Sequence, residues 1–191
     1  STRASPNPPS TPHHLASLRI ACATQAAGLL HTCSEFCMMN VMSKITGTAR
    51  SLAKEASHDR IVDAAARAIR RSGYNGTGVA DIMKEAGLTH GAFYAHFASR
   101  EAMLAEAADR AGAESNAAAV KVLAKAPPDQ ALRTLVEAYL SKAHLESIET
   151  GCPVSALGSE MPRQSPEVRR AATSRIKEMV DLVARQMPDW G

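Results

Sequence analysis

The sequence predicts an all-α protein with no β-sheet, and its composition is the main reason. Alanine, the strongest helix former, supplies 36 of the 191 residues, whereas only seven residues are aromatic. Strands favour aromatic and β-branched residues, so this composition disfavours a β fold. Apolar residues make up 45% of the chain and charged residues 21%, which allows a buried core and argues against gross disorder.

The composition also excludes several other protein classes. The longest apolar stretch, residues 15–30, contains Arg19 and falls short of the roughly 18 uncharged residues of a membrane span, so we expect no membrane partner. Four cysteines in 191 residues do not make a disulfide scaffold. The net charge of +3 is compatible with nucleic-acid binding and equally with ordinary surface chemistry.

Residues 1–56 are expected to form a flexible leader, because residues 1–14 are rich in Pro, Ser and Thr without periodicity. Methionines at positions 39 and 42 suggest that the natural domain begins near there. The run His31-x-Cys33-x3-Cys37 resembles part of a metal site, but no fourth ligand is obvious. We therefore expect no metal and no other cofactor.

The first three helices follow from residue spacing and capping. Ile61, Ala65 and Ile69 repeat at helical spacing, with Ser57 as the predicted N-cap and Gly73 as the stop. A second helix is predicted over 79–86, ended by Gly87, and a third over 90–96, capped by Thr89.

Four more helices complete the expected fold. Ser99 is a suitable cap for a long fourth helix that runs to about Ala124. The run Pro127-Pro128-Asp129 then stops and restarts the chain. The remaining helices are predicted over residues 130–146, 153–161 and 166–187.

Residues 79–97 have the layout of a helix-turn-helix motif, whose second helix enters the major groove of DNA. The turn begins with Gly87 because the chain must reverse there at positive φ. Phe93 and Phe97 are expected to point inward. Four of the seven aromatic residues lie between positions 58 and 105, which predicts a compact module with its own core. The alternative is an ordinary helix–glycine–helix segment of a helical protein.

Specific residues of this module resemble the TetR family (TetR/AcrR) of bacterial transcriptional regulators. The similarity rests on Arg60-Ile61-Val62-Asp63-Ala64-Ala65, on Gly73-Tyr74-x-Gly76-Thr77, and on Asp81-Ile82-x3-Ala86-Gly87-Leu88-Thr89-His90-Gly91-Ala92-Phe93-Tyr94-Ala95-His96-Phe97-x-Ser99-Arg100-Glu101-x-Met103-Leu104. It implies a DNA-binding head over 57–103 and a helical ligand-sensing domain over 104–191. It also implies a cytoplasmic protein that binds double-stranded operator DNA and a small-molecule effector, with repression the commoner mode.

The resemblance assigns DNA contacts residue by residue. His90 and Gly91 would lie nearest the base edges, Thr89 and Arg100 would contact phosphates, and Tyr94 and His96 would donate to the DNA backbone. The full set is Thr77, Thr89, His90, Gly91, Tyr94, His96 and Arg100, with Lys44, Arg50 and Lys54 as a basic arm. The alternative for the arm is plain solvated charge. Gly78, Ala80 and Ala95 depart from the family pattern because larger or hydroxyl-bearing residues commonly stand there.

The sensor half gives candidate ligand contacts but no ligand identity. The candidates are Met103, Ala107, Leu135, Tyr139, His144, Cys152 and Met161. Each of them also suits the interior of a helix bundle, which is the competing interpretation. Cys152 is either a thiol sensor or a small buried residue before Pro153.

Two further expectations concern assembly and chemistry. In the family two long helices normally follow and form the dimer seam, so a homodimer is expected from the resemblance but doubtful for this chain. The second function considered is a regulator without stable dimerisation, acting as a mixed-dimer partner or inert. We expect no enzyme, because the sequence has no Gly-rich phosphate loop, no H-E-x-x-H and no G-x-S-x-G.

Overall fold

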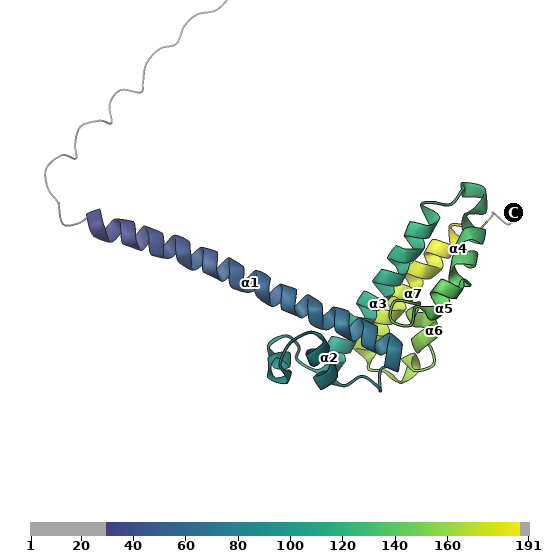
Figure 1. The fold of residues 1–191 in the computed structure, drawn as a ribbon, viewed down its shortest axis with the longest axis horizontal. Coiled ribbons are helices and arrows are strands. Elements are labelled where there is room, and N and C mark those ends of the chain that lie inside the picture. The colour runs from purple at the N-terminus through teal and green to yellow at the C-terminus, as the bar shows by residue number, and fades with distance from the viewer. Residues whose placement is uncertain (1–29, 188–191) are drawn as a thin grey trace, which may run out of the picture. The chain divides into compact units, whose positions relative to one another are not determined.

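The computed structural model describes residues 30–187, with side chains from Ala49 onward. Its contacts divide the chain into Ser1–Ala49 and Arg50–Gly191. The first helix, α1 (Leu30–Ser72), runs across that boundary, and every later element belongs to the second unit (Figure 1). The side chains of His31, Cys33, Cys37 and Lys44 lie outside the described residues.

Between residues 30 and 187 the chain forms helices and turns and no strand, which confirms the predicted fold class. The elements after α1 are α2 (Val79–Glu85), η1 (His90–Ala95), α3 (Arg100–Leu123), η2 (Pro128–Gln130), α4 (Ala131–Tyr139), α5 (Lys142–Glu146), α6 (Pro153–Leu157), η3 (Met161–Arg163) and α7 (Pro166–Ala184). The η elements are 3₁₀ helices. Within the same residues, no helix is long and apolar enough to span a membrane.

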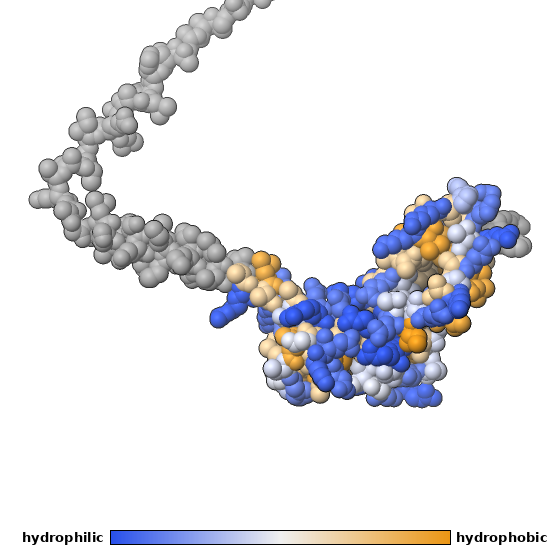
Figure 2. Space-filling view, viewed as in Figure 1, coloured by the Kyte–Doolittle hydropathy of each residue, from blue (hydrophilic) through white to orange (hydrophobic). Residues whose placement is uncertain are grey.

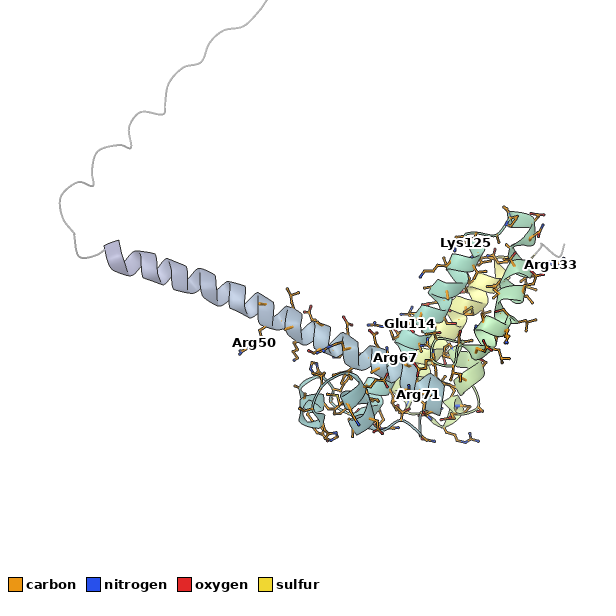
Figure 3. All side chains as sticks on the ribbon, viewed as in Figure 1. Arg50, Arg67, Arg71, Glu114, Lys125 and Arg133 are labelled. Atoms are coloured by element: carbon orange, nitrogen blue, oxygen red, sulfur yellow. The ribbon has the colours of Figure 1, made fainter. Side chains whose placement is uncertain are left out.

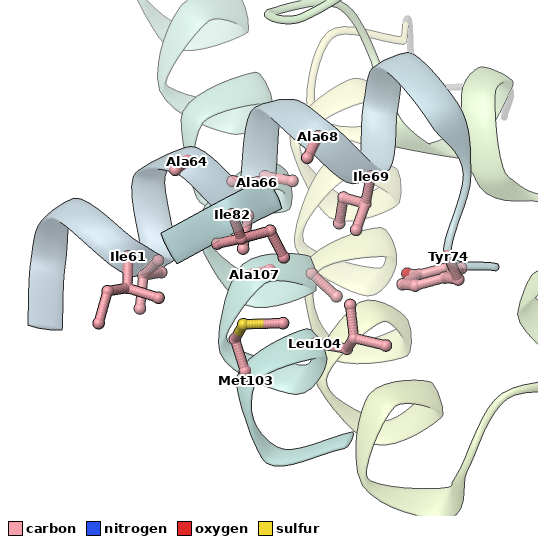
Figure 4. Packing of buried hydrophobic residues seen from close by; sticks show 14 of the residues in the cluster. Ile61, Ala64, Ala66, Ala68, Ile69, Tyr74, Ile82, Met103, Leu104 and Ala107 are labelled. Atoms are coloured by element: carbon pink, nitrogen blue, oxygen red, sulfur yellow. The ribbon is translucent and has the colours of Figure 1, made fainter. Parts of the chain in front are cut away.

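One continuous core joins the head to the helices that come after it. The cluster includes Ile61 and Ile69 of α1, Ile82 of α2 and Leu104 of α3, and all four are fully buried or nearly so (Figure 4). Leu157 of α6 belongs to the same cluster. The expected separate core of residues 58–105 is therefore wrong, because the alanine-rich face of α1 packs on the sensor helices as well as on the head.

The long helices α3 and α7 run side by side, and among the elements that follow α1 they make the most extensive contact (Figure 1). Gly112 permits this approach, since a Cβ placed there would overlap the Cβ of Arg175 on α7. The Arg175 guanidinium donates to both carboxylate oxygens of Asp109, at 2.7 and 2.8 Å. Small residues and one bidentate ion pair thus fix the spacing of the two helices.

Three predicted helix signals are confirmed. Gly73 ends α1 with φ of 74°, and Gly87 follows α2 with φ of 71°, both in the left-handed region that favours glycine. Ser99 caps α3, because its hydroxyl accepts a hydrogen bond from the Ala102 amide at 3.0 Å.

Other boundaries differ from the prediction. Ser57 does not begin a helix; its hydroxyl donates to the Ala53 carbonyl inside α1, an internal bond that serine makes as readily as a cap. The predicted helix over 130–146 is broken before Ser141, which caps α5. The helix from Pro153 ends at Leu157, and α7 ends at Ala184.

Candidate functional site

The turn between α2 and η1 positions the candidate DNA-contacting segment. After α2 the Gly87 amide donates to the Lys84 carbonyl at 3.0 Å and the Leu88 amide to the Met83 carbonyl at 2.8 Å. These bonds close the helix end and turn the chain into η1. The predicted glycine-led turn is therefore confirmed.

Within η1 the aromatic residues divide into an inward and an outward set. Phe93 and Phe97 are 3% and 4% exposed and belong to the core, as predicted. Tyr94 is 73% exposed. Its ring meets Phe93 edge-on at 5.3 Å between centroids and His90 at 6.5 Å. The phenol is thus held by two ring contacts while most of the residue stays exposed.

Thr89, His90 and Gly91 are exposed at the start of η1. The predicted cap by the Thr89 side chain is wrong, since only its backbone carbonyl accepts a bond, from the Ala92 amide at 3.0 Å. The reason is the 3₁₀ geometry of η1, in which the backbone closes the first turn itself. A Cβ added at Gly91 would meet nothing within 4 Å, so this position lies open.

His96 closes η1 in a half-buried position. Its Nδ1 is buried, with no hydrogen-bond partner among the side chains and backbone that the structure describes. Burial lowers the pKa of His96 below its ordinary value of 6.5, and the neighbouring His58 and Lys54 lower it further. The ring is therefore neutral at pH 7.

Thr77 and Arg100 support the loop between α1 and α2. The Thr77 hydroxyl is buried and donates to the Gly73 carbonyl at 2.7 Å. The Arg100 guanidinium donates through one nitrogen to the carbonyls of Tyr74 and Thr77. Arg100 thus holds this loop against the start of α3, whereas the Thr77 bond lies within the loop. The predicted DNA contact of Thr77 and the predicted phosphate contact of Arg100 stay predictions.

The basic arm is only partly within the described side chains. Arg50 and Lys54 are exposed and one helical turn apart on α1. Because Lys54 acts on the pKa of His96, it lies near the end of η1. Sequence reasoning missed His58, one further turn along α1. The i, i+4 spacing of positions 54 and 58 was the signal that could have placed both on one face.

An ion-pair network ties α2 to the end of α1 and to the loop before α6. Glu85 of α2 accepts from Arg67 at 2.9 Å and from Arg71 at 3.1 Å. Arg71 also donates to Glu149 in that loop. Figure 3 shows Arg67 and Arg71 near the C-terminal end of α1. The guanidinium groups raise the acidity of Glu85, so its pKa lies below the usual value although burial opposes this.

Arg70 is the buried charge of this region, with its side chain fully shielded from solvent. It donates to the Glu114 carboxylate at 2.8 Å, to the Glu149 carbonyl at 3.0 Å and to the Ala111 carbonyl at 2.6 Å. One side chain therefore links α1, α3 and the loop before α6. No sequence signal marks it, since Arg70 and Arg71 look alike.

A groove of about 390 Å³ lies along α4, α5 and the start of α6, and we call it the α4–α6 groove. Three predicted ligand residues line it, namely Tyr139, His144 and Cys152. The rings of Tyr139 and His144 are 4.8 Å apart. The rest of the lining is Arg70, Leu140, Ser141, Leu145, Ser147, Ile148, Gly151, Ser155 and Ala156. Its size falls within the range of small-molecule sites.

The other predicted ligand residues lie elsewhere. Met161 and Cys152 line a separate cavity of about 20 Å³, room for about one water molecule. Met103 and Ala107 are fully buried in the core, and Leu135 is half-buried on α4 away from both cavities. These positions favour the core interpretation for Met103 and Ala107. Cys152, half-buried at the N-cap of α6, borders both spaces.

Comparison with known proteins gives consistent matches. The N-terminal model of the bacterial regulatory proteins of the tetR family matches residues 61–107, and a tetracyclin repressor-like C-terminal domain matches residues 128–189. The HTH-type transcriptional regulator LmrA of Bacillus subtilis is 29% identical over 140 residues, 71% of this chain and 73% of LmrA. An uncharacterized HTH-type regulator of Mycobacterium tuberculosis is 30% identical over 125 residues, 62% of this chain and 63% of the relative.

Solved structures share the fold. A TetR transcriptional regulator from Chloroflexus aurantiacus aligns with a TM-score of 0.62 and 26% identity, covering 70% of this chain and 68% of that one. A TetR-family regulator from Agrobacterium tumefaciens aligns with a TM-score of 0.60 and 20% identity, covering 70% of each chain.

Proposed function

Because the chain belongs to the TetR family of bacterial regulatory proteins and is a DNA-binding transcriptional regulator, we propose that its segment 89–96 contacts operator DNA. In this proposal η1 enters the major groove, with His90 and Gly91 at the base edges and Thr89 and Tyr94 at the phosphates. Residues 57–103 form the DNA-binding head and residues 104–191 the sensor domain.

The single observation that carries the proposal is the exposure of Tyr94. A tyrosine that served only the core would be buried, whereas this one is 73% exposed and held edge-on by Phe93 and His90. A rigid ring with a free hydroxyl loses little conformational entropy when it donates to a phosphate oxygen. Thr89, His90 and Gly91 are exposed on the same short element.

Gel-shift with the upstream region of the chain's own gene tests the DNA contact. We expect Tyr94→Phe to weaken binding about fivefold on every sequence, since it removes one hydrogen bond to the backbone. Tyr139→Phe is the matched control, because Tyr139 lies on α4 in the α4–α6 groove. Undiminished binding by Tyr94→Phe would count against the proposed orientation of η1.

The phosphate role of Arg100 needs a different measurement, because this side chain also holds the loop between α1 and α2. A phosphate contact contributes to the salt dependence of binding, whereas a loop contact does not. Arg100→Ala should lower the slope of log affinity against log salt by about one if it meets a phosphate. An unchanged slope assigns Arg100 to loop support alone.

We further propose that the α4–α6 groove holds the effector and that its binding releases DNA, as in a ligand-responsive repressor. The groove combines apolar residues such as Leu140 and Leu145 with the polar groups of Tyr139 and His144, the mixture usual in small-molecule sites. A compound that binds there should weaken DNA binding, and DNA should weaken its binding by the same factor.

We also propose that the regulator acts in the cytoplasm. We propose that it acts there as a homodimer, since two heads would read two half-sites about one helical turn apart. Exposed apolar side chains on α4 and α7, outside the α4–α6 groove, support this, because a second copy would cover them; Figure 2 shows apolar surface over this part of the molecule. They are Val136 and Val180, 45% and 60% exposed. Sedimentation at micromolar concentration tests it, and a monomer would contradict the dimer.

A further inference from the structure

Of the two ring nitrogens of His96, Nδ1 is the one buried without a hydrogen-bond partner among the described residues. The residue as a whole is partly exposed. A neutral imidazole carries a single proton, on either Nδ1 or Nε2. A buried N–H with no acceptor is rarer and costlier in proteins than a buried acceptor with no donor. The burial of Nδ1 therefore favours the tautomer with the proton on Nε2.

The surroundings of His96 also disfavour a second proton. The charged and titratable groups that face the ring from α1 are both basic: Lys54, and His58 with its ring centroid at 5.8 Å. From α3, the Glu106 carboxylate is hydrogen-bonded to Nε2 of His58, at 2.7 Å, and not to His96. A proton added to His96 would thus place a buried, unpartnered N–H beside positive charge.

His58 is itself fixed in place from two sides. Its ring stacks on Phe97 at 4.5 Å between centroids, with 24° between the planes. The bond to Glu106 sets which of its nitrogens faces α3. Since Phe97 belongs to the buried core, its stacking on His58 sets the position of that ring relative to His96, and the more exposed bond to Glu106 adds to its orientation.

We propose that the fold holds His96 as a neutral ring with its proton on Nε2, that this N–H donates to a DNA phosphate, and that His58, oriented by Glu106, is the positioning residue that maintains this state. The inference rests on the proposed contact of segment 89–96 with DNA. The neutral His96 ring would be an uncharged donor, which adds affinity for DNA without adding to counterion release.

Nitrogen-15 NMR of the histidine side chains in the full chain tests the tautomer without DNA. Loss of a signal in His96→Gln assigns the ring. We expect the Nε2–H form to persist to a pH below 6.5, the ordinary histidine value. In His58→Gln the midpoint of the His96 titration should move upward, while His90→Gln, a control on the same element, should leave it in place.

DNA binding to a mixed-sequence duplex at low salt tests the contact. His96→Gln should weaken binding about fivefold and leave the salt slope unchanged, whereas Lys54→Gln should lower the slope if the arm meets a phosphate. The affinity ratio of parent to His96→Gln should stay constant between about pH 6.5 and 8. In the His58→Gln background this ratio should grow as the pH falls.

A failure of the inferred His96 tautomer can be told apart from a failure of the proposed DNA contact. An Nδ1–H or a charged His96 ring at neutral pH overturns the inference whatever the DNA result. An Nε2–H ring combined with undiminished DNA binding by His96→Gln overturns the phosphate contact and removes His96 from the proposed interface. The tautomer measurement on the parent chain needs no variant to fold, so it decides the first question by itself.

Discussion

At the scale of single residues, environment separates side chains that look alike in the sequence. Tyr94 and Tyr74 are both near the head, yet Tyr94 is 73% exposed and Tyr74 is fully buried. The Tyr74 hydroxyl lies near the Met161 sulfur and its amide donates to the Glu160 carboxylate at 3.0 Å. One tyrosine is therefore available for a ligand, and the other serves the junction between α1 and η3.

The burial of Tyr74 has a titration consequence. Burial, with a smaller effect from Glu160, raises the pKa of Tyr74 to about 12. The folded pKa exceeds the unfolded value of 10.0, so this group's contribution to stability is complete below pH 10 and is lost as the pH rises through about 12. In an ultraviolet titration of the native protein, Tyr74→Phe should remove the last tyrosinate step. An unchanged late step would contradict this environment.

The lowered pKa of His96 predicts that stability falls toward low pH, whereas the raised pKa of Tyr74 predicts a fall toward high pH. Its folded pKa lies below the unfolded value of 6.5, so above that value the contribution of His96 to stability is complete. As the pH falls below 6.5 the unfolded state takes up the proton first, and stability is lost until the folded pKa is reached. Urea unfolding of parent and His96→Gln between about pH 7 and 5 should show a smaller acid loss for the variant. Equal losses of stability in the parent and in His96→Gln would contradict the prediction.

At the scale of elements, the close pairing of α3 with α7 depends on a missing side chain. Gly112 lies in the middle of α3, where glycine is normally unfavourable by about 1 kcal/mol relative to alanine. Here a Cβ would overlap the Cβ of Arg175, which is itself held by Asp109. The close approach of the two helices therefore outweighs helix propensity at this position.

Gly112→Ala should lower the free energy of unfolding by about 1–2 kcal/mol, because overpacking exceeds the gain in helix propensity. Gly91→Ala is the matched control, since nothing lies within 4 Å of its added Cβ. It should leave stability within about 0.5 kcal/mol of the parent while altering DNA binding. The midpoint of urea unfolding measures both. A Gly112→Ala protein as stable as the parent would mean that α3 and α7 can move apart.

At the scale of the whole second unit, Arg70 joins parts that are far apart in the sequence. It bonds to α3 through Ala111 and Glu114 and to the loop before α6 through Glu149. Arg71, next to it, pairs with Glu149 and with Glu85 of α2. The same loop therefore contacts both the head and the edge of the α4–α6 groove.

Arg70→Met should destabilise the protein by about 3 kcal/mol, because it removes the donor to the Glu149 carbonyl, the side-chain donor to the Ala111 carbonyl and the partner of Glu114. Arg133→Met tests the same chemical change at the surface, where the Arg133–Glu137 pair is largely exposed. That variant should stay within about 0.5 kcal/mol of the parent. Urea unfolding compares the two, and similar small effects would show that the buried charge is dispensable.

The sequence by itself determined what depends on neighbours within a few positions. Gly73 and Gly87 end helices, Ser99 caps α3, and Phe93 and Phe97 face inward, because turns, caps and helical periodicity are local properties. The family motif lies within such a local stretch. The break before Ser141 escaped prediction since no Gly or Pro marks it there.

Only the tertiary structure decided which distant residues meet. It places His58 between His96 and Glu106, and it surrounds Arg70 with α3 and the loop before α6. It also leaves Met103 in the core while Tyr139 lines a groove. Burial and pairing depend on how whole helices pack, and the charges and spacings along one helix do not specify which partner each side chain will meet.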